Sequence, residues 1–183
     1  YGHKEGQKNV KRTLINCVKI GVKVLSVYVF STENWKRPET EVRFLMSFLK
    51  KSIKSEINEL IKEGVKLRFL GDLSLFDESM VAIIKDAEEQ TALNTTIQLN
   101  VMLNYGGRRE IVDAVQAFVN NGGDIQLLDE QDITKHLYSF ECGDPDILIR
   151  TGGDVRISNF FLWQIAYSEL FFLNCFWPDF SMD

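Results

Sequence analysis

The residues that decide the fold are Val22-Lys23-Val24-Leu25-Ser26-Val27-Tyr28-Val29-Phe30, a run rich in β-branched and aromatic side chains. Such a run predicts a buried β-strand. An apolar helical face precedes it, from Val10 to Gly21, and Pro38 opens a second apolar helical stripe that ends at Gly64. A buried strand between two amphipathic helices predicts an α/β protein.

The same alternation continues to the end of the chain. Further strands are predicted at 65–70, 96–103, 147–149 and 170–173, and further helices at 78–93, after Gly106-Gly107, and at 130–138. We therefore predict a single domain over residues 1–183 with a central, mostly parallel, twisted sheet flanked by helices on both faces. Ligands of such sheets bind outside the carboxyl ends of the strands.

Composition narrows the class of protein. The chain has 183 residues, of which 45% are hydrophobic and 26% charged, and its formal charge of −5 argues against a nucleic-acid partner. Its three cysteines, Cys17, Cys142 and Cys175, are widely spaced, so neither a zinc site nor a disulfide framework is predicted. The sequence has no apolar run of about 18 residues and no signal peptide, and we expect a cytoplasmic protein.

Polar motifs follow three of the predicted strands, at 31–38, 104–110 and 150–159. Two of them contain paired glycines, which let backbone amides approach an anion closely. Arg37, Arg108, Arg150 and Arg156 lie in these motifs, and a guanidinium group fits phosphate oxygens. The alternative is that these arginines pair with acidic residues of the chain itself. The usual nucleotide-binding motifs GxxxxGK[ST] and GxGxxG are absent. The residues alone therefore predict an anion-binding site at the edge of the sheet but do not identify its substrate.

The strongest sequence signal is a set of five ordered motifs. They are Gly2-His3-Lys4-x-Gly6, Phe30-Ser31-Thr32-Glu33-Asn34-Trp35-x-Arg37-Pro38, Asn104-Tyr105-Gly106-Gly107-Arg108, Asp144-Pro145-Asp146-Ile147-Leu148-Ile149-Arg150-Thr151-Gly152-Gly153 continued by Arg156-Ile157-Ser158-Asn159-Phe160, and Trp163-Gln164-x-Ala166-Tyr167-Ser168-Glu169-Leu170 with Trp177-Pro178-Asp179-Phe180. Together they resemble the signature of the cis-prenyltransferases, and most closely that of the bacterial undecaprenyl diphosphate synthases. The resemblance covers nearly the whole chain.

The resemblance implies an activity and a set of roles. It implies a transferase that condenses isopentenyl diphosphate with an allylic diphosphate, usually farnesyl diphosphate, through cis double bonds to give a polyprenyl diphosphate, with Mg²⁺ as cofactor. The residues that match family positions are Asn34 and Arg37 for catalysis, Arg150, Arg156 and Ser158 for isopentenyl diphosphate, His3, Ser31 and Trp35 for substrate binding, and Glu169 for the metal. It also implies a homodimer.

A growing apolar chain needs a hydrophobic tunnel, which we expect to be lined by helix 39–63 and by the strand from Ile97 to Met102. Ile97 resembles the position that floors this tunnel, and a plain core isoleucine is an equal alternative. Trp35 either shapes the site or packs at a strand end. Trp163, Tyr167, Phe171 and Phe172 are expected in the core or at a dimer interface.

The chain departs from the family pattern at its start. The Asp-containing motif Met-Asp-Gly-Asn-Gly-Arg-Trp-Ala, expected upstream of Tyr1, is absent, as is a basic tail beyond Asp183. We therefore expect the chain as written to have little or no activity and the native protein to be longer. Val155 stands where some members have a histidine.

Two rival functions are considered. One is a non-catalytic partner subunit of a heteromeric cis-prenyltransferase, which the presence of Asn34, Arg37 and Arg150 disfavours. The other is a phosphate-binding hydrolase, which would need a nucleophile beside a base, and none stands out. Because a polyprenyl product enters a bilayer, loose peripheral membrane contact is also expected.

Overall fold

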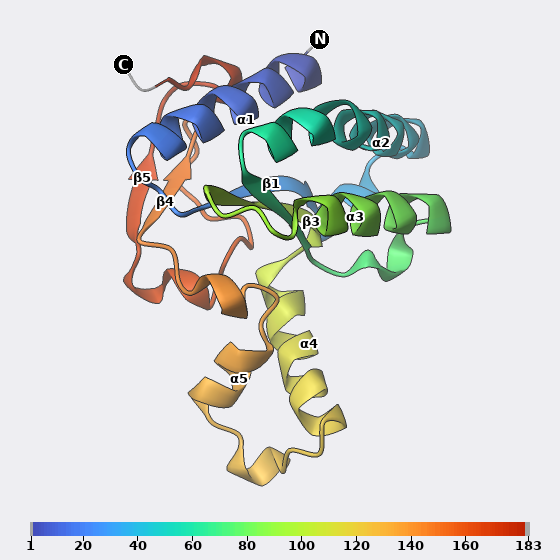
Figure 1. Ribbon diagram of the computed structural model, residues 1–183. Coiled ribbons are helices and arrows are strands. Elements are labelled where there is room, and N and C mark those ends of the chain that lie inside the picture. The colour runs from blue at the N-terminus through green and yellow to red at the C-terminus, as the bar shows by residue number, and fades with distance from the viewer. Residues whose placement is uncertain (1, 182–183) are drawn as a thin grey trace. The chain divides into compact units, whose positions relative to one another are not determined.

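The computed structural model describes residues 2–181, with side chains from residue 5 onward. Within this range the chain falls into two compact units: the first comprises the residues up to Asn104 together with Ser181, and the second covers Tyr105–Phe180. The division falls within one strand, β3 (Ile97–Tyr105). Each unit has its own sheet and its own helices (Figure 1).

The first unit holds three helices and a three-stranded sheet. Its elements are α1 (Gly2–Lys19), β1 (Val24–Ser31), α2 (Glu39–Lys62), β2 (Val65–Leu70), α3 (Glu78–Thr91) and β3 (Ile97–Tyr105), with short 3₁₀ turns η1 (Thr32–Lys36) and η2 (Leu73–Leu75). The strand order is β1-β3-β2, and β2 pairs with β3 in parallel from Val65 beside Ile97 to Leu70 beside Met102. The predicted strands and helices of this unit are confirmed to within a few residues at each end, except that α1 begins at Gly2, well before the apolar face predicted from Val10.

The core of this unit explains the order of the strands. β3 is the central strand, and most of its residues are buried, including Ile97, Leu99, Met102 and Leu103. Of these, Ile97, Leu99 and Leu103 join Val27 and Phe30 from β1, Leu67 and Phe69 from β2, and Ile53 and Ile84 from the helices in one hydrophobic cluster. A central strand of a parallel sheet is buried on both faces of the sheet. Its sequence is therefore apolar along most of its length, as that of β3 is.

The ends of α2 are set by backbone-restricted residues. Pro38 lies immediately before its first turn, where a missing N–H group costs nothing. At its other end, Gly64 has φ +70° and turns the chain directly into β2. A Cβ atom at Gly64 would come within 2.3 Å of the Thr96 hydroxyl, so this position requires glycine for space as well as for backbone angle.

The second unit is smaller and less regular. It contains α4 (Gly107–Asn120), α5 (Glu130–His136), β4 (Ile147–Arg150) and β5 (Glu169–Phe172), with 3₁₀ turns η3 (Ile125–Leu127), η4 (Phe140–Cys142), η5 (Gln164–Tyr167) and η6 (Trp177–Asp179). Helices α4 and α5 lie side by side (Figure 1). β4 and β5 form a parallel pair with Ile147 beside Glu169 and Arg150 beside Phe172.

The α/β class with parallel strands is therefore confirmed. The five expected strands are all present, but the described residues arrange them as two separate sheets of three and two strands. Neither the strand count nor the hydrophobic pattern specifies which strands pair, because pairing depends on contacts between segments far apart in the sequence. No helix among the described residues is long and apolar enough to cross a bilayer.

Candidate active site

The first cluster of predicted site residues follows the end of β1. Ser31 is the last residue of the strand, and its backbone N–H donates a 2.9 Å hydrogen bond to Oδ1 of Asn34. This bond closes the 3₁₀ turn η1 and places Asn34, Trp35 and Arg37 within one tight bend before α2. The sequence spacing thus brings together four of the predicted residues by local structure alone.

Arg37 lies at the mouth of this bend with a partner from the next helix. Its Nη1 donates to Oε1 of Glu41 at 2.7 Å, one turn into α2. Both side chains are more than two-fifths exposed, so this ion pair is well solvated and contributes little stability. Arg37 can therefore exchange its carboxylate partner for a diphosphate at little cost.

An apolar cleft opens beside Arg37. It has a volume of about 610 Å³ and lies between α2 and the segment that links β2 to α3. Its apolar lining consists of Trp35, Val42, Met46, Leu75, Phe76 and Met80, and its polar lining consists of Arg37, Glu39, Arg43, Ser47, Lys50 and Asp77. A volume of this order is typical of sites that bind small organic ligands.

The hydrophobic tunnel stays a prediction, and this cleft contains only part of its expected lining. Helix α2 contributes Val42 and Met46 as predicted, but no residue of β3 lines this cleft. Ile97 is only 2% exposed and pairs with Val65 in the sheet, within the hydrophobic cluster of the unit. This burial is compatible with both interpretations of Ile97, a core isoleucine and a residue at the floor of the tunnel. The lining that the sequence missed comes from Leu75 to Met80, whose approach to α2 is a long-range contact.

The second cluster of predicted residues follows β4. Arg150, the last residue of the strand, donates from Nη1 to Ser158 Oγ at 2.7 Å and from Nη2 to Asp154 Oδ2 at 3.1 Å. Arg156 donates from Nη2 to the same Asp154 oxygen at 2.6 Å. The structure thus joins Arg150, Arg156 and Ser158 as predicted, and it adds Asp154 as their shared counter-ion.

The paired-glycine turns do not act as expected. The amides of Gly152 and Gly153 donate to the carbonyls of Cys175 and Leu173, at 2.7 and 3.0 Å. The first amides of α4 are also used, because Gly107 N donates to the Asn159 carbonyl and Arg108 N donates to Asn159 Oδ1. The prediction that these amides bind an anion is therefore wrong for this structure: they hold neighbouring chain segments. The arginine side chains of these motifs are therefore the remaining candidates for anion binding.

The metal ligand and the histidine complete the predicted set. Glu169 begins β5 with an exposed side chain, and its backbone N–H donates to the Asp146 carbonyl at 2.9 Å. Among residues with described side chains, no group of three or more His, Cys, Asp or Glu converges on a common point. His3 lies in the first turn of α1, and its side chain is outside the described residues.

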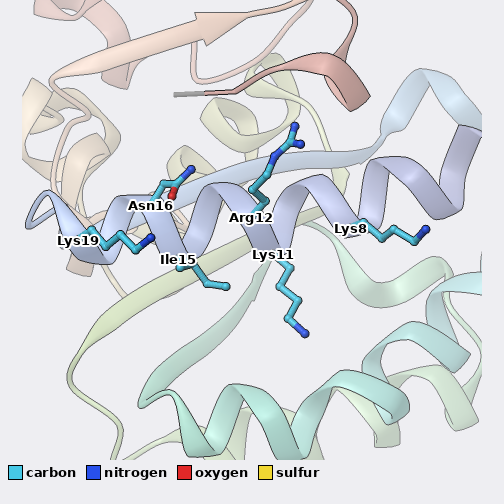
Figure 2. Close-up of a pocket in the computed structure, with 6 residues that line it drawn as sticks. All are labelled: Lys8, Lys11, Arg12, Ile15, Asn16 and Lys19. Atoms are coloured by element: carbon cyan, nitrogen blue, oxygen red, sulfur yellow. The ribbon is translucent and has the colours of Figure 1, made fainter. Parts of the chain in front are cut away.

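A separate hollow lies along α1 and is lined by Lys8, Lys11, Arg12, Ile15, Asn16 and Lys19 (Figure 2). Two of its lysines form ion pairs, Lys8 with Glu5 and Lys11 with Glu59. None of the predicted site residues lines it. This hollow is basic, shallow and composed of residues from one helix.

An α/β fold with two arginines sharing a counter-ion at one strand end, and an aromatic-walled apolar cleft beside another arginine, fits the class of enzymes that act on apolar diphosphates. Comparison with known proteins agrees. A family model described as "Putative undecaprenyl diphosphate synthase" matches residues 1–183, and the chain belongs to this prenyltransferase family.

Relatives of known name are similar over nearly the whole chain. The isoprenyl transferase of Bacillus subtilis (strain 168) is 45% identical over 186 residues, which cover 100% of this chain and 72% of the relative. The ditrans,polycis-undecaprenyl-diphosphate synthase ((2E,6E)-farnesyl-diphosphate specific) of Vibrio vulnificus (strain YJ016) is 43% identical over 185 residues, which cover 99% of this chain and 74% of the relative.

Solved structures show the same fold. A probable undecaprenyl diphosphate synthase from Campylobacter jejuni matches with a TM-score of 0.89 and 31% identity, over 97% of this chain and 83% of the other. Lavandulyl diphosphate synthase from Lavandula x intermedia, solved in complex with dimethylallyl diphosphate, matches with a TM-score of 0.90 and 32% identity, over 98% and 80%. The expected family, α/β fold and prenyl-transfer class are confirmed.

Proposed function

We propose that this enzyme condenses isopentenyl diphosphate units with an allylic diphosphate, most simply farnesyl diphosphate, to give a long cis-polyprenyl diphosphate such as undecaprenyl diphosphate. The observation that carries the proposal is the cluster at the end of β4, where Arg150 and Arg156 share the carboxylate of Asp154. Two guanidinium groups held at one carboxylate are prepared to receive a dianionic group in its place. The names of the relatives supply the chemistry of the substrates.

Arg150, Arg156 and Ser158 are proposed to bind the diphosphate of isopentenyl diphosphate. The Arg150 side chain is 25% exposed and that of Arg156 is 65% exposed, so both can reach a ligand that arrives from solvent. Nε of Arg150 is buried and has no partner within the described part of the chain. A buried donor without a partner is costly, and a ligand oxygen would satisfy it.

Trp35, Arg37 and the apolar cleft are proposed to bind the allylic substrate. Breaking its carbon–oxygen bond places negative charge on the leaving diphosphate, which a fixed arginine such as Arg37 stabilises. The allylic carbon becomes cation-like at the same time. The apolar walls formed by Val42, Met46 and Met80 would keep water away from it. Ser31 and Asn34 fix the turn that presents these groups.

We propose Mg²⁺ as the cofactor and Glu169 as one of its ligands. An exposed single carboxylate fits this role, because Mg²⁺ typically binds one or two carboxylates together with substrate phosphate oxygens and water. When bound, the ion would neutralise charge on the departing diphosphate. His3 is proposed to take part in substrate binding, as the family resemblance implies.

The decisive experiment measures incorporation of radiolabelled isopentenyl diphosphate by the full-length protein with farnesyl diphosphate and Mg²⁺, followed by sizing of the product. Long cis-polyprenyl products would support the proposal. No incorporation by the full-length homo-oligomer, with recovery on addition of a second, different subunit, would instead identify a non-catalytic partner. Release of inorganic phosphate without chain growth would indicate a hydrolase.

We further propose that the enzyme is a homodimer and works in the cytoplasm in loose contact with a membrane. Support for the dimer is the exposure of large apolar side chains in the second unit, including Tyr167 and Phe176. Support for membrane contact is the chemistry of the proposed product, a lipid. Co-sedimentation with phospholipid vesicles tests the contact: protein that stays in the supernatant with and without bound product would contradict it.

A further inference from the structure

Asn104 is a buried polar residue with an unusual backbone. It lies near the carboxyl end of β3, is 2% exposed, and has φ +47°, in the left-handed region. Asparagine tolerates this region better than most residues with a side chain. The neighbouring strand end approaches closely, because a Cβ atom on Gly71 would lie 1.9 Å from the Leu103 carbonyl oxygen. The turn of the backbone at Asn104 therefore occurs in a tightly restricted space.

The side chain of Asn104 joins two separate segments of the first unit. Its Oδ1 accepts a 2.7 Å hydrogen bond from Nε1 of Trp35, and its Nδ2 donates a 2.7 Å hydrogen bond to the Asp72 carbonyl. An indole N–H can only donate and a carbonyl can only accept, so the orientation of the amide is fixed by its partners. To bond both Trp35 and Asp72, the residue at position 104 needs a short side chain that carries one hydrogen-bond acceptor and one donor.

Trp35 is otherwise held by ring contacts. Its ring meets Phe30 edge-on, with centroids 5.1 Å apart and planes at 78°, and lies 5.7 Å from Phe76 at 49°. Such contacts fix the ring loosely, because aromatic pairs have broad minima of geometry. The hydrogen bond to Asn104 adds a directional restraint, and Trp35 forms part of the wall of the apolar cleft beside Arg37 and Phe76.

We propose that Asn104 is a positioning residue for prenyl transfer: it fixes the indole of Trp35 in the wall of the cleft and so sets the affinity for the allylic diphosphate. This proposal rests on the proposed function for the identity of the ligand. A buried left-handed residue whose amide spans two segments is costly to maintain, and such strain concentrates at functional sites. The cleft needs the restraint because a rotated indole would change the shape of its wall.

The test uses the full-length enzyme with Asn104→Gly, Trp35→Phe and the double variant. Glycine keeps the left-handed backbone and removes only the amide. Phenylalanine keeps an aromatic ring and removes the Nε1 donor. A fourth variant, Asn104→Asp, is made alone and with Trp35→Phe. It retains an acceptor for the indole and loses the donor to Asp72, so it separates the two hydrogen bonds of Asn104.

The first readout needs no substrate. The fluorescence of Trp35 is obtained by subtracting the spectrum of the matching Trp35→Phe protein from that of each Asn104 variant. We expect Asn104→Gly to shift the emission of Trp35 to longer wavelength and to increase its quenching by acrylamide, with a smaller change for Asn104→Asp. Unchanged emission and quenching in Asn104→Gly would overturn the proposal.

The second readout is steady-state kinetics. Asn104→Gly and Trp35→Phe should each raise the KM for the allylic diphosphate about tenfold, with the KM for isopentenyl diphosphate unchanged. In the Trp35→Phe background, Asn104→Gly should change the KM for the allylic diphosphate by less than about twofold. If Asn104→Gly raised the KM for the allylic diphosphate equally in both backgrounds, Asn104 would act through Asp72 and not through Trp35. That result would overturn the proposal. An unchanged KM in Trp35→Phe, which leaves Asn104 intact, would also overturn the proposal.

The two readouts separate this inference from the proposed function. A full-length wild-type protein without prenyl transfer would refute the proposed function, while the fluorescence comparison would still decide whether Asn104 fixes Trp35. Melting curves of each variant, followed by circular dichroism, ensure that folded proteins are compared.

Discussion

At the scale of single residues, the candidate site depends on charged groups that already have partners. Asp154 holds Arg150 and Arg156 in place, and Glu41 holds Arg37. The sequence left open the alternative that these arginines pair with acidic residues of the chain itself, and the structure shows such pairs for Arg37, Arg150 and Arg156. Pairing and ligand binding are compatible here, because exposed ion pairs are weak enough to exchange.

Arg156→Ala should raise the KM for isopentenyl diphosphate about tenfold or more, since it removes a charged donor from the proposed diphosphate site. The KM for the allylic diphosphate should stay unchanged. Arg109→Ala is the matched control, because Arg109 is an exposed arginine of α4 that pairs with Asp113. Steady-state kinetics on the full-length enzyme measure both values; a KM for isopentenyl diphosphate that Arg156→Ala leaves unaltered would contradict the assigned role.

Glu110 is a buried acid that lies outside the proposed chemistry. It is 1% exposed, and its carboxylate accepts hydrogen bonds from the Tyr138 amide at 3.0 Å and from Gln164 Nε2 at 2.9 Å, together with one from the Tyr105 hydroxyl. Burial is the main cause that raises the pKa of Glu110 above its ordinary value of 4.5, although these hydrogen bonds act in the opposite direction.

The pH dependence of stability follows from this shift. The folded protein binds the Glu110 proton more tightly than the unfolded chain does. The contribution of Glu110 to the free energy of unfolding is therefore most favourable below the pKa that Glu110 has in the unfolded chain. It declines as pH rises from there through the raised pKa of the folded state. Urea unfolding of wild type and Glu110→Gln from about pH 4 to about pH 8 measures this, because glutamine does not titrate. We expect the stability of wild type relative to Glu110→Gln to fall with rising pH; a constant or rising difference would contradict the expectation.

At the scale of elements, the structure shows how helices complete the sheet and the cleft. The outer edge of β2 is covered by α3, because Leu67 N donates to Thr91 Oγ1 at 3.1 Å and Phe69 N donates to Glu88 Oε1 at 2.7 Å. Side chains of a helix thus take the place of a further strand. Covering an edge in this way prevents pairing with another chain.

Thr91→Val tests this edge. Valine has the shape of threonine but cannot accept the hydrogen bond from the buried Leu67 amide, so the free energy of unfolding should fall by about 1–3 kcal/mol. Thr40→Val, at an exposed position of α2, should change it by less than about 0.5 kcal/mol. Urea denaturation gives both numbers. Equal effects of the two substitutions would show that the edge contact contributes nothing.

The cleft between α2 and the segment 75–80 offers a test of product length. Met46→Trp should fill part of its volume of about 610 Å³ and shift the product to fewer isoprene units. The control is Phe44→Trp, because Phe44 is 57% exposed and does not line the cleft. Thin-layer chromatography of labelled products compares them. A wild-type product distribution from Met46→Trp would place the growing chain elsewhere.

At the scale of the whole molecule, several large apolar side chains of the second unit are exposed to solvent. Tyr167 is 99% exposed, Phe176 72% and Phe171 43%. Of these, Tyr167 and Phe171 were expected either in the core or at a dimer interface, and Tyr167 is not in the core of the described structure. A proposed homodimer would bury them.

Tyr167→Asp should therefore weaken the proposed dimer, because it places a charge where an apolar surface would be desolvated. Sedimentation velocity of the full-length protein should show a shift from dimer towards monomer at micromolar concentration. Lys135→Asp is a suitable control, since Lys135 is a solvent-exposed residue of α5. A variant Tyr167→Asp with the wild-type sedimentation coefficient would mean that Tyr167 lies outside any interface.

The sequence by itself determined the family, the order of the helices and strands, and the local turn from Ser31 to Arg37, because these depend on motif residues and on periodicity within short segments. It also predicted the Arg150, Arg156 and Ser158 group, whose members lie within nine residues of one another. Only the tertiary structure decided the division of five strands into two sheets, the lining of the cleft by Leu75 to Met80, and the bond from Asn104 to Trp35. Each of these depends on contacts between residues distant in the chain, which periodicity and motifs do not specify. For the same reason the sequence did not predict that the amides of Gly152 and Gly153 donate to the carbonyls of Cys175 and Leu173.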